Sequence, residues 1–241
     1  MGVAGCIENR TNIDNNTFLF SVKSFKKITE IMDEHTFSAG SILFCEGDLA
    51  NQLYFVKNGS VRLMKTTDDG KELTLYYFHD GDLIHNMDVS ERNISSFSAE
   101  VLQHSVIGIV KRSDLEQLLW KNGDLAVEFI RWLSYMQRFM QLKLRDLLFH
   151  GKHGALASTL IRIANTYGVF DGKVIRFTEK FTHAELASLI GATRETVNRM
   201  LSQFKKDELI DYHKGRIVIL NLEGLKKICH CESCPLTICR L

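Results

Sequence analysis

The feature that most constrains the fold is a change of pattern in the middle of the chain. In residues 37–110, short runs of β-branched and aromatic residues alternate with turn signals, and Gly59, Gly70 and Gly81 follow one another at intervals of eleven. This pattern predicts an antiparallel β-roll or barrel, because each glycine permits a tight turn between strands. Residues 124–150 contain neither glycine nor proline and predict a long helix. The expected fold class is therefore α+β.

The long helix, which we expect to follow a helix cap at Ser113, carries two apolar stripes. The first stripe, at alternating spacings of three and four, consists of Ile130, Leu133, Gln137, Met140, Leu144 and Leu147. The second stripe consists of Phe129, Trp132, Met136, Phe139, Lys143 and Asp146. Two faces need two surfaces to cover them, so we expect one stripe on the roll and the first stripe in a homodimer interface. A core helix buried on both sides within one subunit is the alternative.

Charge and composition narrow the class of protein. The chain has 241 residues, of which 45% are hydrophobic and 24% charged, which is typical of a folded protein large enough for two domains. No apolar run approaches the ~20 residues that a membrane helix needs, and no secretion signal is present, so we expect a cytoplasmic protein. Residues 1–150 hold 16 Lys and Arg against 20 Asp and Glu, and residues 151–241 hold 14 against 9. The basic second half suggests a polyanionic partner, although ordinary surface charge explains it equally well.

Residues 181–210 have the pattern of a helix-turn-helix. Thr182 followed by Glu185 forms a capping-box signature, and Thr193 followed by Thr196 predicts the start of a second helix. Gly191 stands at the tight turn between the two helices. The segment YHKGRIVIL follows and predicts a two-stranded wing. This unit lays its second helix in the major groove of DNA.

The second helix separates buried from exposed positions. Its predicted inward residues are Val197, Leu201 and Phe204. Arginine can donate two hydrogen bonds to guanine, and a carboxylate can accept one from cytosine. The predicted DNA-contacting residues are Arg194, Glu195, Asn198 and Arg199, with the capping residues Thr182 and Thr193. Phosphate contacts are expected from Lys205, Lys206, Lys214 and Arg216. A solvated helix in an unrelated α-helical domain is the alternative.

Four of the six cysteines crowd into residues 229–239. Cys231, Cys234 and Cys239 have the spacing C-x2-C-x4-C, and the chain's one proline, Pro235, follows the second of them. In a reducing compartment such a group indicates metal ligands or redox thiols, and short spacings of this kind hold iron–sulfur clusters. Three thiolates are too few for four irons, and Cys229 would give a cramped C-x-C. A structural zinc site built from the four cysteines, or with His230, is the alternative, with a small-molecule effector in the roll.

The glycine-punctuated roll, the long helix and the motif RETVNRML together resemble the cyclic-AMP receptor/FNR family of bacterial transcription regulators. The resemblance covers nearly the whole chain. It implies a dimer that binds a two-fold DNA site of the TGTGA type through Arg194, Glu195 and Arg199. RNA polymerase is the further partner that we expect.

The roll departs from the pattern of family members that bind cyclic nucleotides. Those members hold the ligand with a Gly-Glu and, about ten residues later, an Arg-Ser or Arg-Thr. This chain has Asp82 in place of the glutamate and Ser95–Ser96 where the arginine pair should stand, and Arg92 is off the pattern. A buried cyclic phosphate without a cationic partner is costly. We therefore expect no cyclic nucleotide.

The match is best with Bacillus-type Fnr regulators, which carry a C-terminal C-x2-C-x4-C motif. The resemblance implies a [4Fe-4S] cluster with Cys231, Cys234, Cys239 and Asp146 as its ligands, and control of genes for anaerobic metabolism. Asp146 also extends the second helix stripe where an apolar side chain is expected. Its alternative role is a salt bridge with Lys143 or Lys152.

The expected cluster would tie the tail to the end of the long helix, and its loss to oxygen would free the tail. We expect a sensor-like domain at 1–112, a dimerisation helix at 113–150, a DNA-binding domain at 151–228 and a cluster-binding tail at 229–241, with Gly151 and Gly154 as the hinge. An enzyme is disfavoured, because the chain has no nucleotide-binding glycine fingerprint. Of its nine histidines, His79, His85, His104 and His153 are scattered and are not paired with carboxylates at ligand or catalytic spacing. Cys6 and Cys45 are expected to be a free surface thiol and a buried strand residue.

Overall fold

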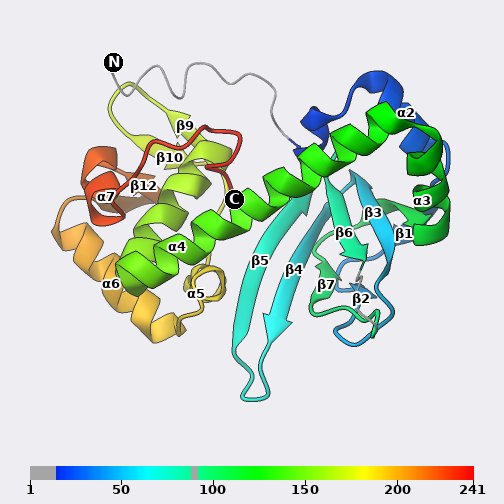
Figure 1. Cartoon of the computed structure of the whole chain (residues 1–241). Coiled ribbons are helices and arrows are strands. Elements are labelled where there is room, and N and C mark those ends of the chain that lie inside the picture. Colours follow the sequence, from blue (N-terminus) through cyan, green and yellow to red (C-terminus); the bar gives the residue numbers. More distant parts are fainter. Residues whose placement is uncertain (1–14, 88–91) are drawn as a thin grey trace. The chain divides into compact units, whose positions relative to one another are not determined.

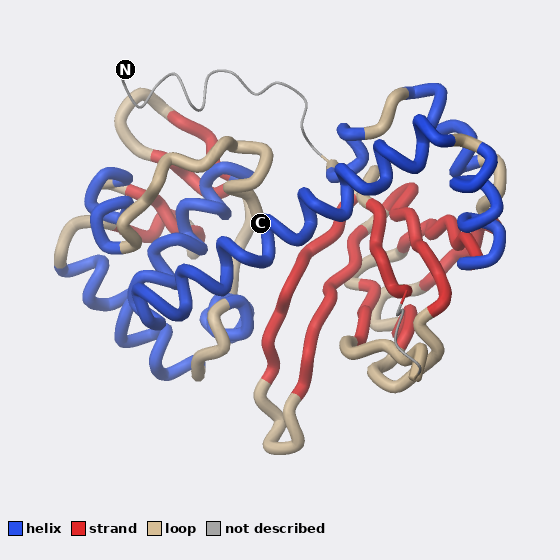
Figure 2. Tube along the Cα trace, viewed as in Figure 1, coloured by secondary structure: helices blue, strands red, loops and turns tan. Residues whose placement is uncertain are grey.

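A computed structural model describes residues 15–87 and 92–241 (Figure 1). The chain forms two compact units: one contains the roll and ends at Met136, and the other contains Gln137–Leu241 and the hairpin tip Asp68–Leu73. Strands dominate the first unit and helices the second, so the expected α+β class is confirmed (Figure 2). Cys6 lies outside the described residues. No helix in the described part is both long and apolar enough to cross a membrane.

The roll consists of two four-stranded sheets of antiparallel strand pairs. The strand order is β1-β8-β3-β6 in one sheet and β2-β7-β4-β5 in the other. The strands are β1 Asp33–Phe37, β2 Ile42–Phe44, β3 Asn51–Asn58, β4 Ser60–Thr66, β5 Glu72–His79, β6 Leu83–Met87, β7 Ser98–Val101 and β8 Ser105–Lys111. Leu53 and Val56 of β3 and Val110 of β8 are fully buried. Leu53 and Val56 are three residues apart and point to opposite faces of β3, so both faces of this strand are covered.

Glycine sets the turns of the roll where the sequence predicts them. Gly59 joins β3 to β4 with a φ of 114°, and a Cβ atom there would lie 1.9 Å from Oγ of Ser105. Gly70 and Gly81 also have positive φ, at 76° and 87°. Because L side chains rarely adopt this conformation, these positions favour glycine.

Helices close one end of the roll. They are the 3₁₀ turn η1 Asn16–Leu19, α2 Val22–Thr29 and α3 Arg112–Lys121. Strand β8 leads directly into α3, whose cap position is Lys111, so the expected cap at Ser113 is wrong. Phe129 and Trp132 of the following helix pack with Leu53 and Leu83 in one core cluster. The expected packing of the second stripe on the roll is confirmed for these two residues.

Helix α4, Gly123–Tyr167, is two helical segments joined at Gly151, whose φ of 57° and ψ of −167° are not helical. The expected break is therefore confirmed at Gly151. Gly154 lies within the second segment, where a Cβ atom would meet Cβ of His150 at 2.2 Å. Gly154 thus permits close packing and does not break the helix.

The first segment of α4 exposes a narrower stripe than the sequence predicts. Ile130, Gln137 and Leu144 of the predicted interface are exposed, whereas Leu133, Met140 and Leu147 are half-buried. The exposed positions at spacings of three and four are Val127, Ile130, Ser134, Gln137, Gln141, Leu144 and Leu148.

The second unit packs helices against a small sheet of order β11-β12-β10-β9. Its elements after α4 are β9 Gly168–Phe170, β10 Ile175–Phe177, α5 His183–Leu189, α6 Arg194–Lys206, β11 Ile210–His213, β12 Arg216–Ile219 and α7 Leu222–Ile228. Leu156, Leu160 and Ile163 of α4 are fully buried in this unit. The cysteine-rich tail follows α7.

Candidate functional site

The helix-turn-helix is formed by α5 and α6. The Thr182 side chain accepts a hydrogen bond from the Glu185 N–H, and the Glu185 carboxylate accepts one from the Thr182 N–H, so the capping box is confirmed. Oγ1 of Thr193 accepts from the N–H of Thr196 at the start of α6. Gly191 has a φ of 57° in the turn between the two helices. Each helix therefore begins where its cap predicts.

Helix α6 buries its predicted inward face and exposes the other. Val197, Leu201 and Phe204 are buried. The side chains expected to contact DNA are all exposed: Thr182, Thr193, Arg194, Glu195, Asn198 and Arg199. They lie on the outer face and the caps of the helix-turn-helix.

The basic residues expected at phosphates divide into two kinds. Lys206, Lys214 and Arg216 are exposed. Lys205, in contrast, forms an ion pair with Asp211 at 2.6 Å and lies 5.9 Å from the ring centroid of Tyr212. Lys205 is thus engaged with strand β11. Lys214 and Arg216 lie exposed at the turn of the wing.

The cysteine-rich tail folds back onto the second segment of α4. Nδ2 of Asn165 donates to the carbonyl of Cys239 at 2.6 Å, and the N–H of Leu241 donates to Oγ1 of Thr166 at 3.0 Å. Ile238 and Leu241 are buried. The rings of His150 and His230 stack with centroids 4.9 Å apart. The tail is therefore held by polar and apolar contacts within the second unit.

Asp146 lies buried at the centre of a network of charged groups. Its Oδ2 accepts from Oγ of Ser158 at 2.5 Å and from Nη2 of Arg162 at 3.0 Å. Its Oδ1 accepts from Nε and Nη2 of Arg145 at 3.1 and 2.7 Å. Nη1 of Arg162 donates to the carbonyl of Ile238 at 3.4 Å. The network thus joins both segments of α4 to the tail.

The thiols of the tail share this electrostatic environment. Burial, with smaller contributions from Asp146 and two neighbouring thiols, raises the pKa of Cys239 to about 11, although Arg162 opposes the shift. A hydrogen bond from the Cys229 thiol lowers the pKa of Cys231, and the same bond raises the pKa of Cys229. Burial tends to lower the pKa of Arg145, but Asp146, Glu232 and Cys234 raise it overall. Asp146 therefore lies close enough to Cys229 and Cys239 to contribute to the pKa of both thiols.

The candidate donors are the thiols of Cys231, Cys234 and Cys239 and the buried carboxylate of Asp146. Within residues 15–87 and 92–241, no three His, Cys, Asp or Glu side chains gather around one point as a single metal ion requires. A tetrahedral zinc site needs four donors about 2.0–2.3 Å from one ion. A [4Fe-4S] cluster binds each ligand at a different iron, and its thiolate donors are present in the tail. The buried carboxylate of Asp146, which acts on the charges of Cys229 and Cys239, has the chemistry of a further donor.

The sequence did not identify the partners of Asp146. Ser158 and Arg162 lie one turn apart in a largely apolar segment, and both are buried. Buried polar residues four apart on a helix lie on the same face, which was an available signal. Arg145 and Glu232 gave no comparable signal, because charged residues beside an exposed surface are common.

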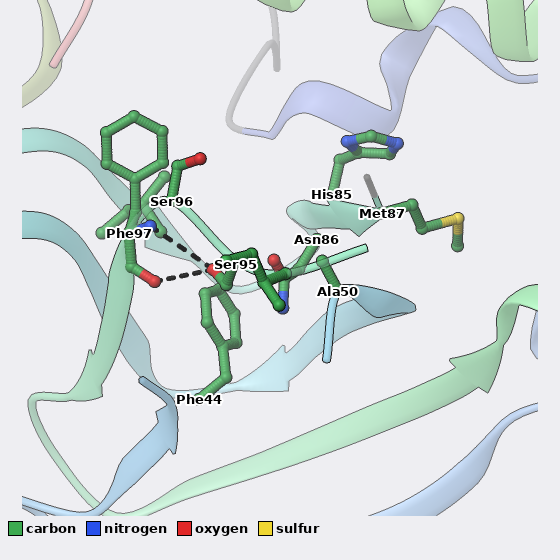
Figure 3. A pocket seen from close by; sticks show the side chains of 10 residues that line it. Phe44, Ala50, His85, Asn86, Met87, Ser95, Ser96 and Phe97 are labelled. Atoms are coloured by element: carbon green, nitrogen blue, oxygen red, sulfur yellow. Dashed lines mark hydrogen bonds between the residues drawn. The ribbon is translucent and has the colours of Figure 1, made fainter. Parts of the chain in front are cut away.

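A second candidate site is a cavity of about 180 Å³ in the roll (Figure 3). In Figure 3, Oγ of Ser95 donates to the carbonyl of Phe97 at 2.7 Å, beside the labelled side chains of Asn86 and Phe44. The described residues that line the cavity are Phe44, Ala50, Leu63, His85, Asn86, Met87, Ile94, Ser95, Ser96 and Phe97. This set includes neither lysine nor arginine.

The titratable side chains near the cavity are either neutral or already bonded to other protein groups. Burial lowers the pKa of His85, which favours its neutral form. Nζ of Lys65 donates to the carbonyl of Ser96 at 3.1 Å and also pairs with Glu46. Asp82 accepts hydrogen bonds from the N–H groups of Asn16 and His79 at 2.5 and 2.9 Å, so its carboxylate has a structural role. Cys45 lies exposed after β2, and its expected burial in a strand is wrong.

Comparison with known proteins gives two family matches and several full-length relatives. Residues 154–228 match the Crp-like helix-turn-helix domain, and residues 34–122 match the cyclic nucleotide-binding domain. The chain is 38% identical to the anaerobic regulatory protein of Bacillus subtilis, over 87% of each chain. It is 30% identical to the cAMP-activated global transcriptional regulator CRP of Salmonella typhimurium, over 77% of this chain and 88% of that protein.

The solved structures agree on the fold. A CooA mutant from Carboxydothermus hydrogenoformans superposes with a TM-score of 0.72 at 19% identity, covering 89% of this chain and 99% of that one. The regulator CLP of Xanthomonas campestris superposes with a TM-score of 0.70 at 21% identity, covering 83% and 99%. Both share the roll, the long helix and the C-terminal helix-turn-helix.

Proposed function

Because the chain belongs to the cyclic-AMP receptor/FNR family of transcription regulators, we propose that it controls anaerobic metabolism in response to oxygen or redox state. It is a DNA-binding transcription regulator and not an enzyme. In this proposal the signal enters at a [4Fe-4S] cluster held by Cys231, Cys234, Cys239 and Asp146. The cluster would supply chemistry that the side chains lack, because oxygen can oxidise and dismantle it.

The observation that carries the proposal is the position of Asp146. A carboxylate with a 4% exposed side chain lies near the end of the first segment of α4, within electrostatic reach of Cys229 and Cys239. A carboxylate is a harder donor than a thiolate and is poorly matched to a soft cluster, so this ligand set favours a labile site. The Bacillus subtilis relative is named an anaerobic regulatory protein, which supports the same response.

The contacts of Asp146 supply a route from the tail to the break in α4. Asp146 precedes Gly151, whereas its partners Ser158 and Arg162 follow it. A change of partner at Asp146 therefore alters the energy of one arrangement of the two segments relative to another, which is what a two-state switch requires. The tail is also held by Asn165 and Thr166 through protein atoms alone. These contacts favour a shift of the tail over its complete release.

The roll cavity supports a regulator without a cyclic nucleotide. A cyclic phosphate in this cavity would find neither lysine nor arginine among the described residues that line it. Arg92 is exposed and is not one of those residues. Leaving a buried phosphate unpaired costs several kcal/mol, which would offset much of the binding energy.

The exposed stripe on α4 suits a homodimer. Regulators of this family are typically dimers. The stripe places Ile130 and Leu144 on the surface at heptad positions, with 62% and 54% exposure, and Gln137 between them. Such a seam buries its apolar residues against a second copy. We infer a dimer that binds a two-fold TGTGA-type site through Arg194, Glu195 and Arg199, with RNA polymerase as a further partner.

The proposal is tested by isolating the chain under strict exclusion of oxygen. We expect a brown protein that contains iron and acid-labile sulfide and that bleaches in air, together with a change in its affinity for a TGTGA-type site. Asp146→Ala should weaken cluster retention, and Lys152→Ala, a change of an exposed residue on the same helix, should not. A colourless protein that carries stoichiometric zinc would reject the proposal.

A further inference from the structure

The two arginines at Asp146 differ in how firmly they are held. Arg162 has a 4% exposed side chain, bonds Asp146 and the carbonyl of Ile238, and lies 5.7 Å from the ring centroid of Phe139. Arg145 has a 20% exposed side chain. Its Nη1 lies 2.5 Å from Oε2 of Glu232 in an ion pair without a well-aligned hydrogen bond. Arg162 is therefore the more deeply buried of the two, and Arg145 is the partner of Asp146 that keeps some solvent exposure.

Both oxygens of Asp146 are occupied by protein donors. Oδ2 takes its bonds from the buried groups of Ser158 and Arg162, and Oδ1 takes its bonds from Arg145 alone. If Asp146 ligates iron, one oxygen must exchange its partner. Breaking the contacts of Oδ2 would leave a buried guanidinium unpaired, which is strongly destabilising. Oδ1 would instead lose Arg145, which keeps its pairing with Glu232 and its contact with solvent.

We propose that Asp146 reaches the cluster through Oδ1 and releases Arg145, while Ser158 and Arg162 keep hold of Oδ2. This inference rests on the proposed function. Arg162 and Ser158 are positioning residues, because they act on the cluster through Asp146. Arg145 is a competitor for the same oxygen. Its second partner, Glu232, lies between Cys231 and Cys234, so the released arginine remains paired to the segment that carries two ligands.

The position of Arg162 adds a second effect. Its guanidinium donates to the carbonyl of Ile238, one residue before Cys239, so its positive charge lies beside a proposed ligand. A fixed positive charge beside a cluster raises its reduction potential, because reduction adds negative charge there. Removing this charge should therefore lower the potential, whereas a purely structural role would leave the potential unchanged.

The test compares matched variants of the full chain, Arg162→Gln and Arg145→Gln, after anaerobic reconstitution with ferrous iron and sulfide. The rate at which a chelator removes iron, the acid-labile sulfide and the midpoint potential are measured. Arg162→Gln should lose iron about 10–100-fold faster than the wild type, as expected when the partner of a metal-binding carboxylate is removed. Its midpoint potential should shift to more negative values. Arg145→Gln should lose iron more slowly than the wild type.

Two further variants keep the inference falsifiable if Arg162→Gln folds poorly. Ser158→Ala removes one bond to Oδ2 and no charge, so it should speed iron loss by a smaller factor and leave the potential unchanged. Arg162→Lys keeps the charge and should restore the potential but only part of the retention, because an ammonium cannot bridge Asp146 and Ile238 as a guanidinium does. Faster iron loss from Arg145→Gln than from Arg162→Gln would overturn the inference. A wild type that never takes up iron and sulfide would instead reject the proposed function.

Discussion

The roll and the second unit each offer a place where a signal could enter, and the two places differ in charge. The roll cavity is lined by apolar, hydroxyl and amide side chains and by His85, whose pKa is lowered by burial. The site around Asp146 brings together two arginines, a carboxylate and the tail thiols. A family match to a cyclic nucleotide-binding domain therefore does not identify the effector. The charged side chains present at each site indicate which ligand that site can hold.

The largest expected effect separates the tail cysteines from one another. Cys239→Ser should abolish cluster assembly, because it removes one of three thiolate donors. The control, Cys229→Ser, should retain the cluster, because this thiol donates a hydrogen bond to the carbonyl of Lys226 and is not in the proposed ligand set. Iron and acid-labile sulfide per chain are measured after anaerobic reconstitution. Equal losses of iron and sulfide in both variants would contradict the assignment of Cys239, and not Cys229, as a ligand.

A second substitution tests whether α6 makes the base-specific contacts with DNA. Arg199→Ala should cost about 1–3 kcal/mol of discrimination at one base pair, because an arginine paired with guanine reads that base directly. The control Lys214→Ala, at the turn of the wing, should weaken binding to all sequences alike and reduce the salt dependence. Both are measured by titrating DNA variants at several salt concentrations. A uniform loss for Arg199→Ala would make this residue a phosphate contact.

A smaller effect concerns Lys143, which lies on the stripe that leads to Asp146. Burial, with a contribution from Arg162, lowers its pKa to about 7. In the unfolded chain a lysine has a pKa near 10.4, so between about pH 7 and pH 10 the unfolded state binds more protons, and stability rises with pH. Lys143→Met should increase the free energy of unfolding by at least about 1 kcal/mol near pH 8, and the gain should shrink toward pH 10.

Urea denaturation at several pH values measures the effect of Lys143→Met. Lys152→Met is the matched control, because Lys152 is exposed and should change stability by less than about 0.5 kcal/mol. A gain that does not depend on pH would mean that the methionine acts through packing alone.

The smallest expected effect is none at all. Cyclic AMP should leave both the melting temperature and the DNA affinity unchanged, because the described wall of the roll cavity supplies neither lysine nor arginine for its phosphate. A ligand that binds only the folded state raises the melting temperature with its concentration. A concentration-dependent rise with cyclic AMP would remove the distinction between the two regions.

Local patterns predicted the elements whose cause is local. The capping threonines of α5 and α6, the inward residues of α6 and the glycine turns of the roll lie where expected, because each depends on neighbours only a few residues away. The start of α3 was wrong, because the helix begins where strand β8 ends and not at the better capping residue. Ile130, Gln137 and Leu144 of α4 are exposed as predicted. Between them, Ser134 and Gln141 are exposed, and the predicted Leu133 and Met140 are half-buried.

The sequence by itself determined the α+β class, the helix-turn-helix and the presence of sulfur donors in the tail, because periodicity, capping and spacing are written along the chain. Only the tertiary structure decided which groups surround Asp146. Ser158 and Arg162 reach Asp146 across the break at Gly151, and Glu232 of the tail reaches Arg145, although all three are distant from these partners in sequence. A buried charge depends on its neighbours in space, which no local pattern records.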